Sequence, residues 1–294
     1  MDAPNLSATP TFASRIPLHI GAVGLIARDL DLLANYYRDL LGLAVIERSE
    51  KSVRLGTAGG TTLLEMEHRP NAKPDDTREA GLYHTAFLMP TRLDHARWIM
   101  HMVRNRIEIT GASDHGVSEA FYLDDPEGNG VEVYNDRPRE RWNWENGLVT
   151  MPTKQLDIEA ILREIDPATA TYPVAPDGLR IGHVHLRVGS VDKAEEFYRG
   201  ALGLDLTRRR GGATFMSSGG YHHHVGANVW HSDGAGRRDN DRAGLAWFSV
   251  QAADAAAYDA AVAGLKAAQA PLDANGTGVE TTDPFGTRVH LLKA

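Results

Sequence analysis

The chain contains an internal repeat, and this repeat limits the folds it can adopt more than any other feature. Residues 20–43 and 181–204 carry glycine, tyrosine and leucine at matching positions, always 161 residues apart, as in Gly21 and Gly182. Each copy begins with alternating apolar residues, passes an acidic turn and continues with apolar residues at helical spacing. Both end in Leu-Gly-Leu, where glycine suits a helix C-terminus. The repeat therefore predicts two copies of a strand followed by a helix.

A β-rich segment follows each copy, at 53–67 and at 213–230. Two further units begin at Gly81 and Gly244, and each again offers a strand, a helix and a closing hairpin. The helices of these two units, and a shorter one between the halves, are expected at 95–104, 253–268 and 158–165. The sequence therefore predicts an α+β protein of four βαβββ units, called units one to four in chain order.

Residues 113–134 hold the most distinctive local pattern of the chain. Asp125 starts an Asp-Pro-x-Gly turn, in which proline fixes φ and glycine permits a positive φ. Alternating residues flank this turn, so the segment is expected to form a β-hairpin. Tyr122 and Glu132 would then lie close together on neighbouring strands. A second Asp-Pro-x-Gly turn, at Asp283, closes unit four in the same way.

The composition argues against several classes of function. The 294 residues suffice for one or two domains with a sizeable core. A net charge of −8 argues against nucleic acid or an anionic membrane as a partner. The absence of cysteine removes disulfides, thiolate metal ligands and a cysteine nucleophile. The polar N-terminus lacks the apolar stretch of a signal peptide, and no segment predicts a transmembrane helix, so a cytoplasmic location is expected.

A known enzyme family shows the same local order of residues. His115, Tyr122, an Asp-Pro-x-Gly turn and Glu132 follow one another here, and this order resembles the signature of the type I extradiol ring-cleavage dioxygenases. The segment 219–230, GGYHHHVGANVW, resembles most closely the bacterial two-domain catechol 2,3-dioxygenases of the CatE type. The resemblance implies a metal-dependent enzyme that acts on an aromatic ring.

The four βαβββ units also resemble the vicinal oxygen chelate superfamily, over nearly the whole chain after residue 16. In that superfamily, paired units curl their sheets around a metal. The resemblance implies a flexible arm, two glyoxalase/dioxygenase-like domains made from units one and two and from units three and four, and a connector. The expected boundaries are 1–16 for the arm, 17–136 for the first domain, 137–177 for the connector and 178–294 for the second domain.

The same resemblance places metal ligands on the first and fourth strands of a unit. The first strands of units one to four offer, in order, Ala22, His84, His183 and Trp247. The fourth strands offer, in order, Glu65, Glu132, the run His222–His224 and His290. Units two and three together supply two histidines and one carboxylate. Such a set leaves coordination positions open on non-haem Fe(II).

Two pairings of the units are open. If units two and three share the site, the predicted ligands are His84, His183 and Glu132 and the expected metal is Fe(II), with Mn, Zn or Ni as alternatives. If units one and two share it, the set becomes Glu65, His84 and Glu132, which is more similar to a glyoxalase site. The first set is favoured because two histidines occupy the same repeat position, where the sister units have alanine and tryptophan.

The family resemblance also implies acid–base residues. His115 and Tyr122 precede the glutamate ligand as in the family signature, and a phenol near the iron can hydrogen-bond a bound hydroxyl. The triple histidine lies where the family places an acid–base histidine. Strand alternation puts His222 and His224 on one face and His223 on the other. His222 and His224 are the predicted catalytic members of the run, although the sequence leaves open which face meets the metal. The alternative for the histidine run is a packed row of polar side chains. The alternative for Tyr122 is a role in the core.

These residues favour one function and leave two alternatives. The resemblance implies an Fe(II)-dependent extradiol dioxygenase that cleaves catechol or a substituted catechol with O2 to a muconic semialdehyde. The second hypothesis is a glyoxalase-like metal-dependent isomerase or lyase. The third is a metal-free protein that sequesters a small molecule. The expected partners are a catecholic substrate and O2. Exposed sheet edges often pair between subunits in such folds, so a homo-oligomer is also compatible with the sequence.

Overall fold

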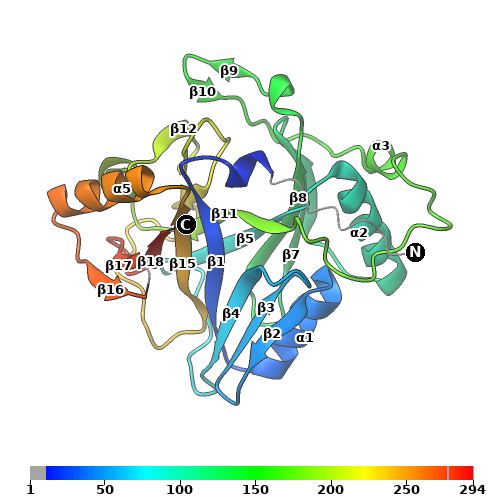
Figure 1. Ribbon diagram of the computed structural model, residues 1–294, viewed down its shortest axis with the longest axis horizontal. Coiled ribbons are helices and arrows are strands. Elements are labelled where there is room, and N and C mark those ends of the chain that lie inside the picture. Colours follow the sequence, from blue (N-terminus) through cyan, green and yellow to red (C-terminus); the bar gives the residue numbers. More distant parts are fainter. Residues whose placement is uncertain (1–10, 277, 294) are drawn as a thin grey trace.

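The computed structural model describes residues 11–276 and 278–293, and these form four successive βαβββ units as predicted (Figure 1). Unit one consists of β1 (Leu18–Ala27), α1 (Leu30–Leu41), β2 (Ala44–Arg48), β3 (Ser52–Gly56) and β4 (Thr62–His68). Unit two consists of β5 (Gly81–Leu88), α2 (Arg92–Asn105), β6 (Gly111–Asp114), β7 (Ser118–Asp124) and β8 (Gly130–Asp136).

The second half of the chain repeats this order after a connector. The connector holds η2 (Arg139–Arg141), β9 (Trp144–Glu145), β10 (Leu148–Val149) and α3 (Ile158–Leu162). Unit three consists of β11 (Arg180–Arg187), α4 (Val191–Glu195) with its π-helical continuation η3 (Glu196–Ala201), β12 (Asp205–Arg210), β13 (Ala213–Ser217) and β14 (Val225–Asn228). Unit four consists of β15 (Gly244–Ala252), α5 (Ala255–Ala267), β16 (Asp273–Asn275), β17 (Gly278–Thr282) and β18 (Arg288–Lys293).

The four units combine into two eight-stranded sheets. One, the site sheet, joins units three and two in the order β12-β13-β14-β11-β5-β8-β7-β6. The other, the companion sheet, joins units four and one in the order β16-β17-β18-β15-β1-β4-β3-β2. In each sheet the first strands of two units run antiparallel at the centre, and each first strand pairs in parallel with the fourth strand of its own unit. Both sheets therefore take strands from both halves of the chain.

Local sequence signals explain where the helices begin and end. The side chain of Asp29 accepts a hydrogen bond from the backbone N–H of Leu32 and caps α1. The helix ends at Gly42, whose φ of +67° is the left-handed conformation that glycine adopts readily. Gly203, in the second Leu-Gly-Leu, has a φ of +89°. The expected role of glycine in the repeat is confirmed.

Two matching tyrosine–aspartate contacts tie the units together. Tyr37, on α1, donates its hydroxyl hydrogen to Asp125 Oδ2 at 2.9 Å, so a helix of unit one is fixed to the hairpin turn of unit two. Tyr198, at the repeat-equivalent position, donates to Asp283 Oδ2 at 2.9 Å in the same way. All four side chains are buried. Each contact links one sheet to the other, because its two units belong to different sheets.

The segment before β1 differs from the predicted arm. Residues 1–10 lie outside the described residues, but η1 (Phe12–Ser14) and Ile16 pack against the site sheet. Ala13 and Ile16 are buried, and the Phe12 ring lies 6.1 Å from that of Trp142. Residues 12–16 are held against the sheet because they bury apolar side chains.

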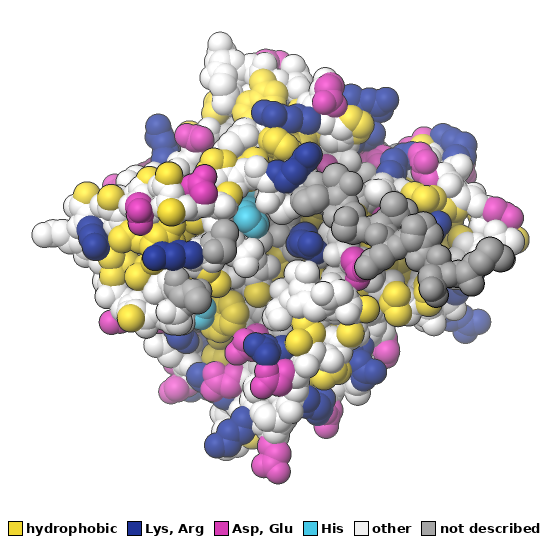
Figure 2. Space-filling view, viewed as in Figure 1, with side chains coloured by type: hydrophobic (Ala, Val, Ile, Leu, Met, Phe, Trp, Pro, Cys, Tyr) yellow, Lys and Arg dark blue, Asp and Glu magenta, His cyan; other side chains and the backbone are white. Residues whose placement is uncertain are grey.

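Charged side chains of both signs share one face of the molecule. On the face shown in Figure 2, Lys and Arg side chains lie interspersed with Asp and Glu side chains. None of the helices in the described part of the chain combines the length and apolar character needed to cross a bilayer.

Candidate metal and active site

Two histidines and one glutamate converge on the site sheet. His84 lies on β5, His183 on β11 and Glu132 on β8, and β5 runs between the other two strands. All three are buried, and each offers a ligand atom within 4.8 Å of the other two. Ala86 pairs with His183 on one side and with Glu132 on the other. Because the alanine side chain is small, the side chains of His183 and Glu132 can meet above it. His84 lies two residues before Ala86 on β5, so its side chain points to the same face of the sheet.

The arrangement of polar atoms fits a bound cation. Glu132 Oε2 lies 3.0 Å from His84 Nε2 and 3.1 Å from His183 Nε2. The nitrogen of His84 is buried without a well-directed hydrogen bond, although it lies close to this oxygen. Buried polar atoms are rarely left in this state unless an ion or water satisfies them. Two imidazole nitrogens and a carboxylate aimed at one point form the donor set of a facial 2-His-1-carboxylate site.

The protonation states also suit ligation. Burial by itself raises the pKa of Glu132, but the neighbouring His183 and His84 outweigh this and hold its pKa well below the usual range. Burial lowers the pKa of His183 to about 4, and the nearby Glu132 opposes this shift only in part. Near neutral pH, Glu132 is therefore ionised and His183 is neutral. These are the forms in which the two side chains bind metals.

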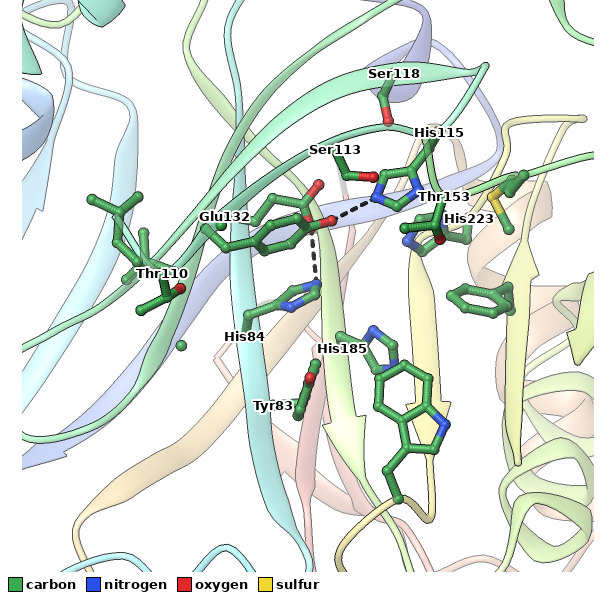
Figure 3. A pocket seen from close by; sticks show the side chains of 18 of the residues that line it. Tyr83, His84, Thr110, Ser113, His115, Ser118, Glu132, Thr153, His185 and His223 are labelled. Carbon is green, nitrogen blue, oxygen red and sulfur yellow. Dashed lines mark hydrogen bonds and ion pairs between the residues drawn. The ribbon is translucent and has the colours of Figure 1, made fainter. Parts of the chain in front are cut away.

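His84 and Glu132 line a cavity of about 520 Å³, within the range of small-molecule sites (Figure 3). Aromatic rings form much of its wall: Tyr83 and Trp230 lie edge-to-face with ring centroids 5.3 Å apart, and Phe215 lines the wall near them. A planar aromatic ligand would find apolar surface here next to the candidate metal site.

His115 and Tyr122 both line this cavity and contact each other. His115 Nδ1 lies 2.8 Å from the carbonyl oxygen of Pro152, and Nε2 lies 2.7 Å from the Tyr122 hydroxyl. Since a carbonyl only accepts, Nδ1–H of a neutral His115 donates to Pro152 and Nε2 accepts from Tyr122. Tyr122 is directly opposite Glu132 in the β7–β8 pair, which confirms the predicted hairpin. Burial, with the charge of Glu132, raises the pKa of Tyr122 well above its usual value.

The triple histidine is placed differently from the prediction. The run lies in the bend before β14 rather than on a fourth strand, and β11 pairs with Gly226 where a ligand position was expected. His223 is the member that lines the cavity, with its ring centroid 4.0 Å from that of His183. His222 points to Asp136, and His224 is fixed by Ser217 and the backbone of Ala13. The predicted pair His222 and His224 thus does not line the cavity, and His223 does.

The sequence reasoning missed two residues of this region. His185 lines the cavity and is directly opposite His84 in the β5–β11 pair. Its Nε2 accepts a hydrogen bond from the side-chain amide of Asn228 at 3.1 Å. Asp136 lies on the same face of β8 as Glu132, four residues further on. The period of two along each strand could have indicated both residues.

The companion sheet has no equivalent of this cluster among the described residues. The Trp247 ring stacks on the His290 ring with the two centroids 4.3 Å apart. A Cβ atom on Gly24 would lie only 2.3 Å from the indole nitrogen of Trp247. His290 Nε2 lies 2.9 Å from Glu280 Oε2. Glu65 belongs to this sheet, so the alternative ligand set of Glu65, His84 and Glu132 is not assembled.

Comparisons with known proteins agree with this geometry. The family described as Glyoxalase/Bleomycin resistance protein/Dioxygenase superfamily matches residues 19–133 and 180–291. Over 236 residues the chain is 37% identical to the catechol-2,3-dioxygenase of Bacillus subtilis (strain 168). The aligned region covers 79% of this chain and 82% of that protein.

Among solved structures, glyoxalase I from Zea mays is similar with a TM-score of 0.57 at 15% identity, covering 96% of this chain and 94% of that one. The cppA protein from Streptococcus pneumoniae TIGR4 is similar with a TM-score of 0.54 at 12% identity, covering 94% of this chain and 100% of that one. At these identities the two structures show a shared fold and nothing further.

Proposed function

This chain belongs to the Glyoxalase/Bleomycin resistance protein/Dioxygenase superfamily, and from that premise we propose that it is an Fe(II)-dependent extradiol dioxygenase acting on catechol or a substituted catechol. One observation carries the proposal: His84 and Glu132, which belong to the facial donor set with His183, line the same cavity as the His115–Tyr122 pair. The relative from Bacillus subtilis that is named catechol-2,3-dioxygenase supports the same reaction class. The expected product is a ring-opened muconic semialdehyde.

The three converging residues would hold the metal. Fe(II) bound there would bring the two catechol oxygens and O2 together and pass electrons between them. His84 and Glu132 line the cavity, so the substrate and O2 would reach the three residues through it.

His223 and Tyr122 would handle the protons of the substrate. Burial lowers the pKa of His223 well below its usual value, so its imidazole is neutral and its unprotonated nitrogen can accept a hydrogen bond from a catechol hydroxyl. Tyr122 remains a neutral phenol because its pKa is raised. Its hydrogen is directed to His115, which leaves its oxygen lone pairs free to accept a hydrogen bond from a substrate hydroxyl.

The aromatic wall would hold the ring and exclude water. Tyr83, Phe215 and Trp230 present faces and edges against which a planar ring can pack. Excluding water strengthens the electrostatic interactions of the neighbouring ionised carboxylate and protects reactive species from hydrolysis. The cavity is larger than a bare catechol ring needs, so ring substituents fit the same site.

Reconstitution tests the proposal. The anaerobically purified, metal-stripped protein is loaded with Fe(II), mixed with catechol and exposed to air while O2 uptake and the yellow ring-opened product are followed. Both signals should appear with Fe(II) and stay absent with the same protein loaded with Zn(II). Isomerisation of a glyoxal–thiol adduct without O2 uptake would instead identify a glyoxalase-like enzyme. Tight catechol binding that needs no metal and yields no product would identify a sequestering protein.

A further inference from the structure

Two hydrogen-bond chains start from imidazoles of the candidate site and end on one oxygen atom, Oδ1 of Asp136. Asp136 is the last residue of β8, and its side chain is partly exposed at the edge of the site region. No step of the proposed reaction uses this carboxylate directly. Its position at the end of both chains suggests that it acts through them.

The first chain begins at the cavity. His223 Nδ1 lies 2.7 Å from His222 Nδ1, and His222 Nε2 lies 2.9 Å from Asp136 Oδ1. His222 is fully buried, so its ring joins the cavity-lining imidazole to the carboxylate without contact with solvent.

The second chain begins at a candidate ligand. His183 Nδ1 lies 3.3 Å from the Tyr134 hydroxyl, and this hydroxyl lies 2.8 Å from that of Tyr221. The Tyr221 hydroxyl donates to Asp136 Oδ1 at 3.2 Å. Both tyrosines are fully buried. The chain also depends on Gly182, because a Cβ atom there would lie 1.8 Å from the Tyr134 hydroxyl oxygen.

An ionised carboxylate only accepts hydrogen bonds, and this fixes the direction of the second chain. Tyr221 gives its single hydroxyl hydrogen to Asp136, so Tyr134 must give its own hydrogen to Tyr221. The Tyr134 oxygen is then able to accept from Nδ1–H of His183, but Glu132 Oε2, 3.1 Å from His183 Nε2, also needs a donor. The single N–H of a neutral His183 can serve only one of these acceptors, so this chain alone does not fix the tautomer of His183.

The same rule directs the first chain. His222 donates Nε2–H to Asp136, so a neutral His222 accepts at Nδ1. His223 must then donate from its own Nδ1, because the two Nδ1 atoms share one hydrogen. The remaining nitrogen of His223, Nε2, keeps its lone pair.

We propose that Asp136 is the positioning residue of His223, because its negative charge, acting through His222, fixes the tautomer of that imidazole. The carboxylate keeps the proton of His223 on Nδ1, which leaves its Nε2 ready to accept a hydrogen bond from a substrate hydroxyl. The role of His223 rests on the proposed function, but its tautomer follows from the hydrogen-bond chain alone.

The test reads the tautomer directly in the metal-free protein. NMR of the histidine-15N-labelled chain, assigned with His223→Gln, should show the His223 ring protonated at Nδ1. In Asp136→Asn, the amide can donate as well as accept, so this ring should shift toward the Nε2–H form. Asp239→Asn, at a surface pair with Lys73 outside both chains, should leave the wild-type pattern. An Nε2–H ring of His223 in the wild type, or an unchanged pattern in Asp136→Asn, would overturn the proposal.

Two further variants separate the branches and need only small changes of side chain. His222→Gln cuts the chain between Asp136 and His223, so it should alter the His223 tautomer and lower kcat while KM for catechol and metal affinity hold. Tyr221→Phe cuts the other chain, so it should leave the His223 tautomer unchanged. Equal effects of both variants on His223 would contradict control of its tautomer through His222. The expected tautomer in a protein without dioxygenase activity would refute the proposed function and leave this inference intact.

Discussion

His183 Nε2 lies 3.1 Å from Glu132 Oε2, although His183 belongs to unit three and Glu132 to unit two. The antiparallel pairing of β5 with β11 brings the two together, because Ala86 lies between them in one row of the sheet. Neither half of the chain carries the whole donor set. The site therefore forms only when both halves fold into one sheet.

Removing one candidate ligand should abolish metal retention. In His183→Ala the remaining His84 and Glu132 supply two donors, which hold a labile divalent ion much more weakly than three. The metal content of Fe(II)-loaded protein after desalting should fall from about one ion per chain to nearly none. Elemental analysis measures this directly.

His290→Ala is the matched control for that experiment. His290 is also a histidine on a fourth strand, but it lies in the companion sheet and contacts Glu280 and Trp247. Its removal should leave the metal content unchanged. Full metal retention in His183→Ala, or loss in His290→Ala, would show that the ion binds elsewhere.

Tyr122→Phe should separate metal binding from turnover. The phenylalanine keeps the aromatic ring but removes the hydroxyl that contacts His115 at 2.7 Å. Because the hydroxyl is proposed to accept a hydrogen bond from substrate, kcat for catechol should fall by about 10- to 100-fold, at or below the low end of general acid–base effects. Metal content should stay at the wild-type level. Unchanged kcat would limit Tyr122 to packing.

Buried His95 should make the fold sensitive to acid. Burial lowers the pKa of His95 from 6.5 to about 4, with its bond to Asn135 opposing the shift in part. Between these two pH values the unfolded chain binds a proton that the folded chain does not. The free energy of unfolding therefore falls as the pH falls through this window, by on the order of a few kcal/mol for this residue.

The variant His95→Asn isolates this contribution from that of other buried histidines. Asparagine retains a donor toward Asn135 but does not titrate. Urea unfolding at several pH values between 6.5 and 4 should show a shallower loss of stability than in wild type, by up to one proton in slope. Parallel curves for the two proteins would contradict the assigned pKa.

The two repeat-related tyrosine contacts should contribute similar stability. Tyr37→Phe removes a buried hydrogen bond to Asp125, and Tyr198→Phe removes its counterpart to Asp283. Each should lower the free energy of unfolding by about 1–2 kcal/mol in urea titrations. Tyr36→Phe is the control, because its hydroxyl contacts an exposed carbonyl oxygen and its loss should cost less than about 0.5 kcal/mol. A larger effect of the control than of the buried pair would refute this account.

The repeat and the turns allowed much of the fold to be predicted. The four βαβββ units follow from hydrophobic periodicity and glycine-terminated helices, which are local properties. Tyr122 and Glu132 could be placed side by side because one short turn connects their strands. The sequence also offered His84, Glu132 and His183 as candidates. Their roles as ligands stay a prediction, but their convergence is now a structural fact.

The sequence by itself determined the type of each unit, the hairpin at Asp125 and the supply of imidazoles and carboxylates, because these depend on neighbours within about 20 residues along the chain. Only the tertiary structure decided that unit two pairs with unit three, that His223 rather than His222 or His224 lines the cavity, and that Asp136 ends both chains. These outcomes depend on contacts between strands that are far apart in the chain. Local patterning leaves such pairings open, and packing of the whole molecule selects one.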